Sequence, residues 1–280
     1  SPRDETKYSE YKSFVQVTDI FPVNSTGIKT HRDAFVIDSD KNALERRISQ
    51  FRDLSLSDEI IRKAFNLKDT RDWSMSKARK QLAENQNWKN HISSITYRPF
   101  DNQFIYNSSE LVEWPRKETM QHMSEENLML ITVRQVAEGV FSHAFISDIL
   151  VESRITTSNR GMAYVFPLYL YPDEENHEGL LPMEGIDGVV LEKTANIDQM
   201  LMKKLEDNYG KNVSPEDVLF YIYAVLYSPS YRSVYADFLK FDYPRIPFTS
   251  DYALFRQMAE LGERLKNLHL MTSDELNEPV

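Results

Sequence analysis

The feature that most constrains the fold of this chain is the stretch from Tyr97 to Asp173, in which apolar runs alternate with short polar segments. The apolar runs have the length of buried strands and cover residues 128–133, 144–151 and 162–171. The segments between them carry Arg, Gln, Asn and Ser. This alternation predicts a scaffold that presents polar side chains on its loops, where binding residues concentrate. We therefore expect the functional centre of the chain here.

The same stretch carries several local signals. Asp101-Asn102 lies between two β-prone runs and predicts the turn of a hairpin. Pro115 favours the start of a short helix. Pro167 lies within the last apolar run and indicates an edge strand or a bulge, because proline cannot donate a hydrogen bond to a sheet. Together the runs predict a β-sheet, which we expect to be mixed.

Residues 14–23, on the N-terminal side, alternate loosely and predict a strand. Residues 40–92 then repeat apolar side chains at the helical period, and Ser57 has the sequence context of a helix cap. The last helix of this segment has a basic side, which we expect to face solvent. That side consists of Lys77, Arg79 and Lys80.

The C-terminal segment is also expected to be helical. Gly210 is placed to end one helix in a left-handed conformation. Ser214-Pro215 predicts the start of the next helix, with a cap followed by proline in the first turn. The final helix has leucines at helical spacing over residues 254–268. Such apolar stripes are far more often core than ligand sites, and no chemistry is assigned to them.

These signals predict an α+β fold, with a central mixed β-sheet region flanked by N-terminal and C-terminal helical segments. We expect an N-terminal junction and helical segment over residues 1–93 and a β-rich recognition core over residues 94–190. A C-terminal helical segment would cover residues 191–280. One composite domain made of all three segments is the alternative.

Composition limits the class of protein. The chain has no cysteine, which excludes disulfides and thiolate metal sites and suits a reducing cytoplasm. It has neither a long apolar run nor a charged-then-apolar leader, so we expect no membrane span and no signal peptide. Its first residue is Ser, and we expect a fragment of a longer protein. The net charge of −10 lowers the expectation of a nucleic-acid partner without removing it, because binding depends on where cations lie.

The usual signatures of catalysis are missing from the sequence. The histidines form no zinc-binding motif, and His122 and His143 are expected to be structural. No glycine-rich phosphate loop and no nucleophile elbow occurs. Pro172-Asp173 resembles the opening of a nuclease motif but lacks the acid-x-lysine that should follow. We therefore expect no catalytic residue and no metal ligand in this chain, although a glycosidase-like carboxylate pair stays open.

Several unusual strings resemble one family. They are Asp19–Ile28, Thr30–Asp33, Tyr97–Asp101, Pro115-Arg116 with Met120 and His122-Met123, Phe166–Tyr171, Tyr221–Leu226 and Tyr243–Phe248. The chain resembles, over nearly its whole length, the C-terminal target-recognition region of bacterial single-polypeptide restriction–modification enzymes. These are the type ISP group and the related type II fusion enzymes.

The resemblance implies that a nuclease, a translocase and an N6-adenine DNA methyltransferase precede this region in the parent protein. Methylation there uses S-adenosylmethionine and an Asn/Asp-Pro-Pro-aromatic motif, and this sequence contains no such motif. The expected function is therefore sequence-specific recognition of double-stranded DNA, without catalysis and without a cofactor in this chain. The expected partners are DNA and the methyltransferase domain of the same polypeptide, in the bacterial cytoplasm.

Base reading is expected from side chains that can form bidentate hydrogen bonds with base edges. The candidates are Arg134, Gln135, Ser158, Asn159 and Arg160. Contacts with DNA phosphates are expected from a second set. Its members are Lys29, His31, Arg32, Arg116, Lys117 and Arg154. The alternative for each candidate is a loop residue bonded to the backbone. The function of Arg98, which recurs in the family strings, stays open.

Two other function classes remain. The abundant tyrosines, tryptophans and carboxylates would also suit a small-molecule enzyme acting on carbohydrates. A purely structural module that couples a motor to a methyltransferase is the third possibility. Binding of duplex DNA at low and moderate salt separates these classes.

Overall fold

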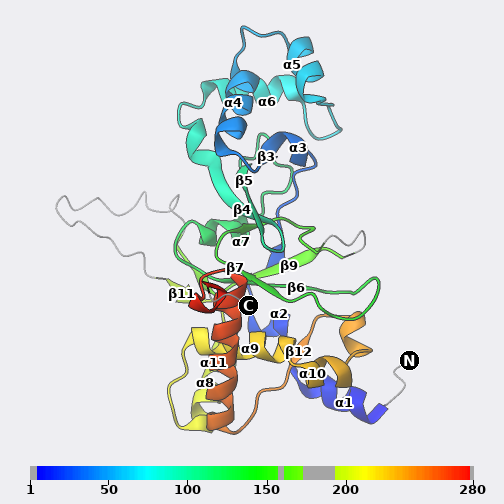
Figure 1. Cartoon of the computed structure of the whole chain (residues 1–280), viewed down its shortest axis with the longest axis vertical. Helices are drawn as coiled ribbons and strands as arrows, with labels where there is room; N and C mark the ends of the chain where they lie inside the picture. Colours follow the sequence, from blue (N-terminus) through cyan, green and yellow to red (C-terminus); the bar gives the residue numbers. More distant parts are fainter. Residues whose placement is uncertain (1–4, 157–160, 173–192, 278–280) are drawn as a thin grey trace, which may run out of the picture.

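The computed structural model describes residues 5–156, 161–172 and 193–277 of the 280-residue chain. In Figure 1 the helices of residues 33–84 lie at one end of an elongated molecule, and the helices of residues 199–269 lie at the other. The longer strands lie between these ends, and α1 (Glu5–Ser13) lies beside the C-terminal helices. This arrangement of helices and sheets confirms the predicted α+β fold class.

The segment after α1 departs from the prediction of a strand. β1 contains only Val15–Gln16, and α2 (Val17–Ile20) follows it directly. Val17, Ile20 and Phe21 are fully buried. Their spacing of three and four residues is that of one helical face, so burial on this face outweighs the loose alternation of the sequence.

The N-terminal helices largely confirm the prediction for residues 40–92. They are α4 (Lys41–Arg52), α5 (Asp58–Phe65) and α6 (Met75–Glu84). Ser57 caps α5 as predicted, because its Oγ accepts a hydrogen bond from the Ile60 amide at 3.4 Å. Asp40 caps α4 in the same way, by accepting from the Asn42 amide at 2.8 Å.

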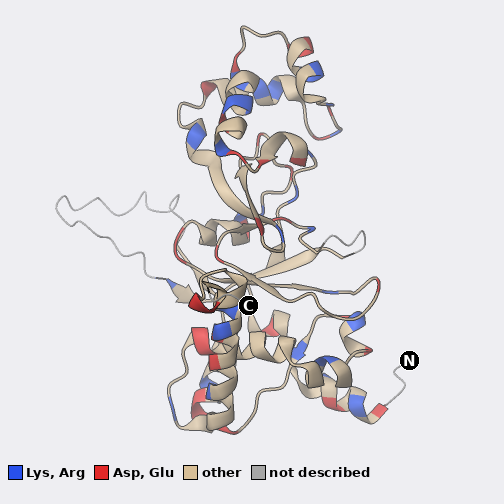
Figure 2. Ribbon diagram, in the orientation of Figure 1, with Lys and Arg blue, Asp and Glu red and all other residues tan. Residues whose placement is uncertain are grey.

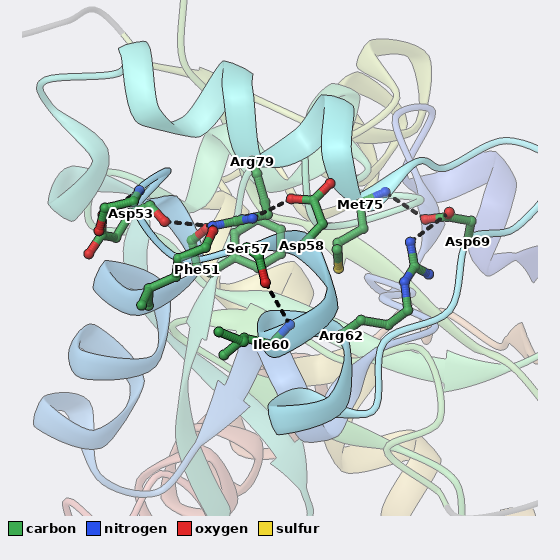
Figure 3. A network of polar contacts seen from close by, with 11 residues as sticks. Phe51, Asp53, Ser57, Asp58, Ile60, Arg62, Asp69, Met75 and Arg79 are labelled. Atoms are coloured by element: carbon green, nitrogen blue, oxygen red, sulfur yellow. Dashed lines mark hydrogen bonds and ion pairs between the residues drawn. The ribbon is translucent and has the colours of Figure 1, made fainter.

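Arg79 in α6 corrects the prediction that the basic side of this helix faces solvent. Lys77 and Lys80 are exposed, but the side chain of Arg79 is buried and points toward the connection between α4 and α5 (Figure 3). Its guanidinium group is bound by the carbonyl oxygens of Phe51 (2.7 Å), Asp53 (2.5 Å) and Leu56 (2.8 Å) and by the carboxylate of Asp58. Arg79 therefore fastens the α4–α5 connection to α6.

Two four-stranded sheets occur among the described residues. The first is antiparallel throughout and is called the central sheet below. Its strands, in spatial order, are β2 (Ser25–Thr26), β9 (Ala163–Pro167), β6 (Met129–Val133) and β7 (Phe145–Ser147). The second sheet contains β3 (Ile37–Asp38), β5 (Asp101–Tyr106), β4 (Ile92–Arg98) and β8 (Leu150–Val151). It is mixed, because β4 pairs with β8 in parallel.

The predicted hairpin is β4–β5, but its turn lies earlier than expected. Arg98 pairs with Asp101, so Pro99 and Phe100 form the turn, and Phe100 has a positive φ of 62°. Two residues of β9 pair with β2, and Pro167 lies beyond them at the end of β9. Its missing amide donor therefore costs no hydrogen bond between β9 and β2. β9 nevertheless lies between β2 and β6 and pairs with β6 in continuous register, so the prediction of an edge strand or a bulge is wrong.

Two hydrophobic cores pack on opposite faces of the central sheet in the described part of the chain. Ile131 and Val165 face the core that contains the N-terminal helices and the β4–β5 hairpin. Leu130 and Phe166 form the neighbouring cross-strand pair and face the core of the C-terminal helices. A strand that is buried on both faces is expected to be mainly apolar, and β6 is apolar at four of its five positions, with the buried Thr132 as the exception.

The C-terminal helices form the second core. They are α8 (Gln199–Tyr209), α9 (Pro215–Tyr227), α10 (Pro229–Val234) and α11 (Tyr252–His269). Gly210 ends α8 at a φ of 59°, and Ser214 caps α9 by accepting from the Asp217 amide at 3.1 Å. Both boundaries agree with the sequence prediction. α9 and α11 approach closely at Gly262, where a Cβ atom would lie 1.8 Å from the carbonyl oxygen of Phe220.

The remaining described elements are short. They include α3 (Asp33–Val36), η1 (Trp88–His91), α7 (Lys117–Met120), η2 (Gln121–Met123), β10 (Tyr169–Leu170), β11 (Thr194–Ala195), η4 (Phe238–Lys240), β12 (Arg245–Ile246) and η5 (Asp274–Asn277). α7 is the short helix predicted after Pro115. The segment boundaries expected at residues 93 and 190 stay predictions.

Candidate nucleic-acid interface

The connections that carry the predicted binding residues leave the central sheet at one edge. β2 and β6 run toward this edge and end at Thr26 and Val133, whereas β9 runs away from it and starts at Ala163. Thr26 pairs with Tyr164 and Val133 with Ala163, so the three ends lie side by side. We call this the loop edge. The strand directions thus place residues 27–32, 134–144 and the segment before Ala163 together, as loops at a common edge of a rigid scaffold.

Main-chain hydrogen bonds bring two further segments to the loop edge. The Ala163 amide donates to the Ser153 carbonyl at 2.8 Å, and the Ser153 amide donates to the Ile28 carbonyl at 2.8 Å. Lys29 and Trp114 exchange two backbone hydrogen bonds, of 3.1 and 3.0 Å. Residues 114–117 and 152–154 therefore lie beside the end of β2, although they are far from it in sequence.

Four of the predicted phosphate contacts lie on these segments and are at least partly accessible: Lys29, Arg116, Lys117 and Arg154. Within the described residues none of them forms an ion pair with a carboxylate, whereas many cations of the N-terminal helices do. Figure 2 shows that Lys and Arg are scattered over the whole ribbon rather than gathered in one region. Other described cations, such as Lys203 and Lys211, also lack an ion pair with a described carboxylate, so the loop edge is distinguished by the convergence of separate segments and not by its cations alone.

His31 and Arg32, the other predicted phosphate contacts, are held by the protein. His31 is exposed but its Nδ1 contacts the Glu113 carboxylate, and Arg32 Nη2 lies 3.9 Å from the same group. The Arg32 side chain is buried, and its Nη1 donates to the carbonyl oxygens of Thr30 (3.2 Å) and Leu111 (3.0 Å). Burial lowers the pKa of Arg32, and the Glu113 carboxylate counteracts this effect. Arg32 therefore supports the segment from within.

Arg134 and Gln135 begin the connection from β6 to β7 and are exposed. Arg134 Nε lies 3.5 Å from the Asp242 carboxylate, and its guanidinium carbon lies 5.9 Å from the ring of Tyr243. Gln135 Nε2 donates to the Phe241 carbonyl at 3.4 Å. Residues 241–243 come from the C-terminal segment, and no local sequence pattern indicates that they support this loop.

The other three predicted base readers, Ser158, Asn159 and Arg160, lie outside the described residues. The described chain resumes at Gly161, two residues before β9 starts at the loop edge. Their assignment to base reading stays a prediction.

Glu152 is a residue of the loop edge that sequence reasoning missed. It is 3% exposed, and its Oε2 accepts hydrogen bonds from Arg98 Nη1 (2.8 Å) and from the Arg154 amide (2.7 Å). Burial raises the pKa of the Glu152 carboxyl, and the Arg154 amide opposes this shift. Arg98, which the sequence left open, thus has a structural partner. The only sequence signal is an acidic residue directly after the apolar run of β8.

The predicted structural histidines are both engaged in the fold. His122 is buried, and its Nδ1 accepts a hydrogen bond from the Tyr171 amide at 3.1 Å. His143 is partly buried, and burial together with the nearby charge of Arg232 lowers its pKa. Among the residues that the structure describes, no three His, Asp or Glu side chains are grouped as metal ligands. None of the described helices is both long and apolar enough to cross a membrane.

A hollow of about 990 Å³ lies away from most of the predicted residues. Lys117 is the one member of the predicted sets that lines it, together with Glu118 of α7 and Glu125. A carbohydrate site would be expected here, but the hollow does not contain the other predicted binding residues. The loop edge is therefore the stronger candidate site.

An α+β scaffold with unneutralised cations and Arg and Gln on converging loops is typical of a recognition domain. A sequence model described as "Type ISP C-terminal specificity domain" matches residues 19–280. The chain belongs to this family, which confirms the resemblance seen in the sequence. A search of curated protein sequences gives no match.

Solved structures agree with this family. The chain is similar to the DrdV–DNA complex, with 25% identity and a TM-score of 0.66 over 90% of this chain and 23% of that one. A nuclease-deletion mutant of the Type ISP restriction-modification enzyme LlaGI, in complex with a DNA substrate mimic, has 25% identity and a TM-score of 0.64, over 100% of this chain and 20% of that one.

The ATP-dependent Type ISP restriction-modification enzyme LlaBIII bound to DNA has 23% identity and a TM-score of 0.71, and this likeness shows the fold. The match covers 100% of this chain and 18% of that one. The chain thus spans about a fifth of the length of these structures.

Proposed function

We propose that this chain is the target-recognition domain of a restriction–modification enzyme and binds double-stranded DNA at the loop edge. The observation that carries the proposal is the convergence of separate connections, with unneutralised cations and the Arg134-Gln135 pair, on one edge of the central sheet. Membership of the specificity-domain family supports it, as do the DNA complexes of the similar structures.

In this proposal the cations of the loop edge contact phosphates. They are Lys29, Arg116, Lys117 and Arg154, with His31 at the margin and Arg32 behind them. Phosphate contacts fix the register and orientation of a protein on the duplex but carry no sequence information. Because these four cations form no ion pair with a described carboxylate, their charge would be available to phosphates although the net charge of the chain is −10.

Base reading in this proposal belongs to Arg134 and Gln135, and to Ser158, Asn159 and Arg160 in the connection before β9. Arginine pairs bidentately with guanine, and Gln or Asn pairs with adenine. The contacts of Arg134 and Gln135 with residues 241–243 support this assignment, because a reader must be aimed by the surrounding structure.

We propose further that the catalytic steps belong to other domains of the parent protein, an N6-adenine methyltransferase that uses S-adenosylmethionine and acts in the bacterial cytoplasm. The lack of an Asn/Asp-Pro-Pro-aromatic motif in these 280 residues supports this division. A methyltransferase must extrude its target base and hold the duplex in register meanwhile, and a separate recognition domain supplies that hold.

Methylation profiling of the parent enzyme across a randomised target library tests the reader assignment. Replacing Arg134, Gln135, Asn159 or Arg160 by Ala should relax or abolish recognition at one base pair, with a loss of about 1–3 kcal/mol of discrimination. Lys117→Ala is the matched control, since it should weaken methylation of all sequences alike.

Retention of the parental target by all four variants would contradict the reader assignment. Absence of duplex binding by the intact parent would contradict DNA recognition itself and would favour the carbohydrate enzyme or the structural coupling module.

A further inference from the structure

Trp114 is an exposed aromatic residue at the loop edge to which the sequence assigned no function. Its side chain is 40% exposed. Lys29 Nζ lies 4.4 Å from the centroid of the Trp114 ring, and the guanidinium carbon of Arg116 lies 5.2 Å from it. Both distances are within the range of a cation–π interaction, for which tryptophan is the best aromatic partner.

The main chain fixes this arrangement. The two backbone hydrogen bonds between Lys29 and Trp114 hold the ammonium stem and the indole side by side. Arg116 directly precedes α7 and has a left-handed backbone conformation with a φ of 54°. This conformation turns the chain back toward Trp114. Within the described residues no hydrogen bond holds the Arg116 guanidinium, so the indole is the group that orients it.

An aromatic ring orients a cation without neutralising it, whereas a carboxylate does both. Glu113, the residue before Trp114, engages His31 and Arg32. Lys29 and Arg116 are left with the indole and form no ion pair with a described carboxylate. The charge of these two cations is therefore available to a ligand, while their side chains are already ordered.

We propose that Trp114 is a positioning residue that holds Lys29 and Arg116 as one preformed clamp for the phosphates of duplex DNA. This inference rests on the proposed function and adds the device that sets its sequence-independent affinity. Ordering long side chains before binding lowers the entropic cost of each phosphate contact. Because the clamp touches no base edge, its loss should weaken binding to cognate and unrelated duplexes equally.

Duplex binding should be measured as a function of salt for Trp114→Tyr, Trp114→Phe and Trp114→Leu, in the isolated chain and in the parent enzyme. Leu keeps an apolar side chain at this position but has no π face, so it is the variant that removes the cation–π contacts. We expect Leu to weaken binding about two- to fivefold for each cation that it releases, with Tyr and Phe in between. The logarithmic salt slope should stay nearly the same with Leu, because both cations can still contact phosphates, whereas Lys29→Met and Arg116→Met should each make it about 0.9 units shallower.

The clamp also predicts that its members are coupled. Trp114→Leu should have little further effect in the Lys29→Met/Arg116→Met background, because the cations that it positions are gone. The thermal midpoint should stay within about 2 °C in all Trp114 variants, as expected for an exposed side chain.

Two results would overturn the inference while leaving DNA recognition in place. One is an unchanged affinity for Trp114→Leu when Lys29→Met and Arg116→Met each weaken binding. The other is a full additive effect of Trp114→Leu in the double-Met background. A lack of salt-dependent duplex binding by the intact parent would instead refute the proposed function, and the clamp with it.

Discussion

At the scale of single residues, Arg79 shows how a charged side chain can hold a fold together. Met75, Ala78, Arg79 and Leu82 are the buried residues of α6, at the spacing i, i+3, i+4 and i+7. This helical spacing puts Arg79 on the buried face, whereas its charge favoured the wrong prediction that it faces solvent. The acceptors on the α4–α5 connection could not be anticipated, because they depend on the path of an irregular segment.

We predict that Arg79→Met lowers the free energy of unfolding by about 3 kcal/mol, since it leaves buried carbonyl oxygens without donors. Urea denaturation measures this loss. Lys80→Met, on the exposed side of the same helix, is the control and should change stability by no more than about 0.5 kcal/mol. Equal midpoints for the two variants would show that the network of Figure 3 contributes little to stability.

At the scale of elements, the sequence predicted the long pieces well and the short ones poorly. The ends of helices with a cap or a proline, such as Ser57 and Ser214, were predicted because the responsible atoms are adjacent in the chain. β1 and β12 contain two residues each and exist only through their pairing across the chain. No local periodicity of the sequence encodes such a pairing.

The contact of α9 with α11 depends on Gly262. We predict that Gly262→Ala destabilises the chain by about 1–3 kcal/mol, because its methyl group would overlap the backbone of Phe220 and force the helices apart. Thermal unfolding checks this value. Glu263→Ala, an exposed neighbour, also introduces alanine into α11 but makes no overlap, and it should leave stability nearly unchanged. A neutral Gly262→Ala would mean that α9 and α11 can separate without cost.

At the scale of the whole molecule, the sequence predicted the functional centre in its β-rich stretch, and it treated the loops of that stretch as self-contained. Arg134 and Gln135 were found from their residue types. Their neighbours in residues 241–243 were not, and neither was the pairing of Lys29 with Trp114. These contacts join segments that are separated by about a hundred residues in the sequence. Only the fold brings them together.

The isolated chain should bind duplex DNA weakly, with an affinity that falls steeply as salt rises, by about 0.9 logarithmic units for each phosphate contact. The net negative charge opposes DNA binding, and in the proposed parent enzyme the methyltransferase domain would supply part of the grip. Calorimetry of the same sample with S-adenosylmethionine should give no heat of binding. Micromolar affinity for that cofactor, or DNA binding indifferent to salt, would contradict the proposed division of labour.

The central sheet has a consequence for how such a domain can acquire a new target. Because β6 and β9 supply side chains to both cores, inserting or deleting one residue within either strand would invert its inside-out pattern on two sides at once. The connection of residues 134–144 carries no strand pairing, but Phe141 and Ala144 within it are buried in the core of the C-terminal helices, so only its exposed residues escape this constraint. We therefore expect a new target to be acquired by exchange of the exposed residues of this loop, while the strands beneath it tolerate neither insertion nor deletion.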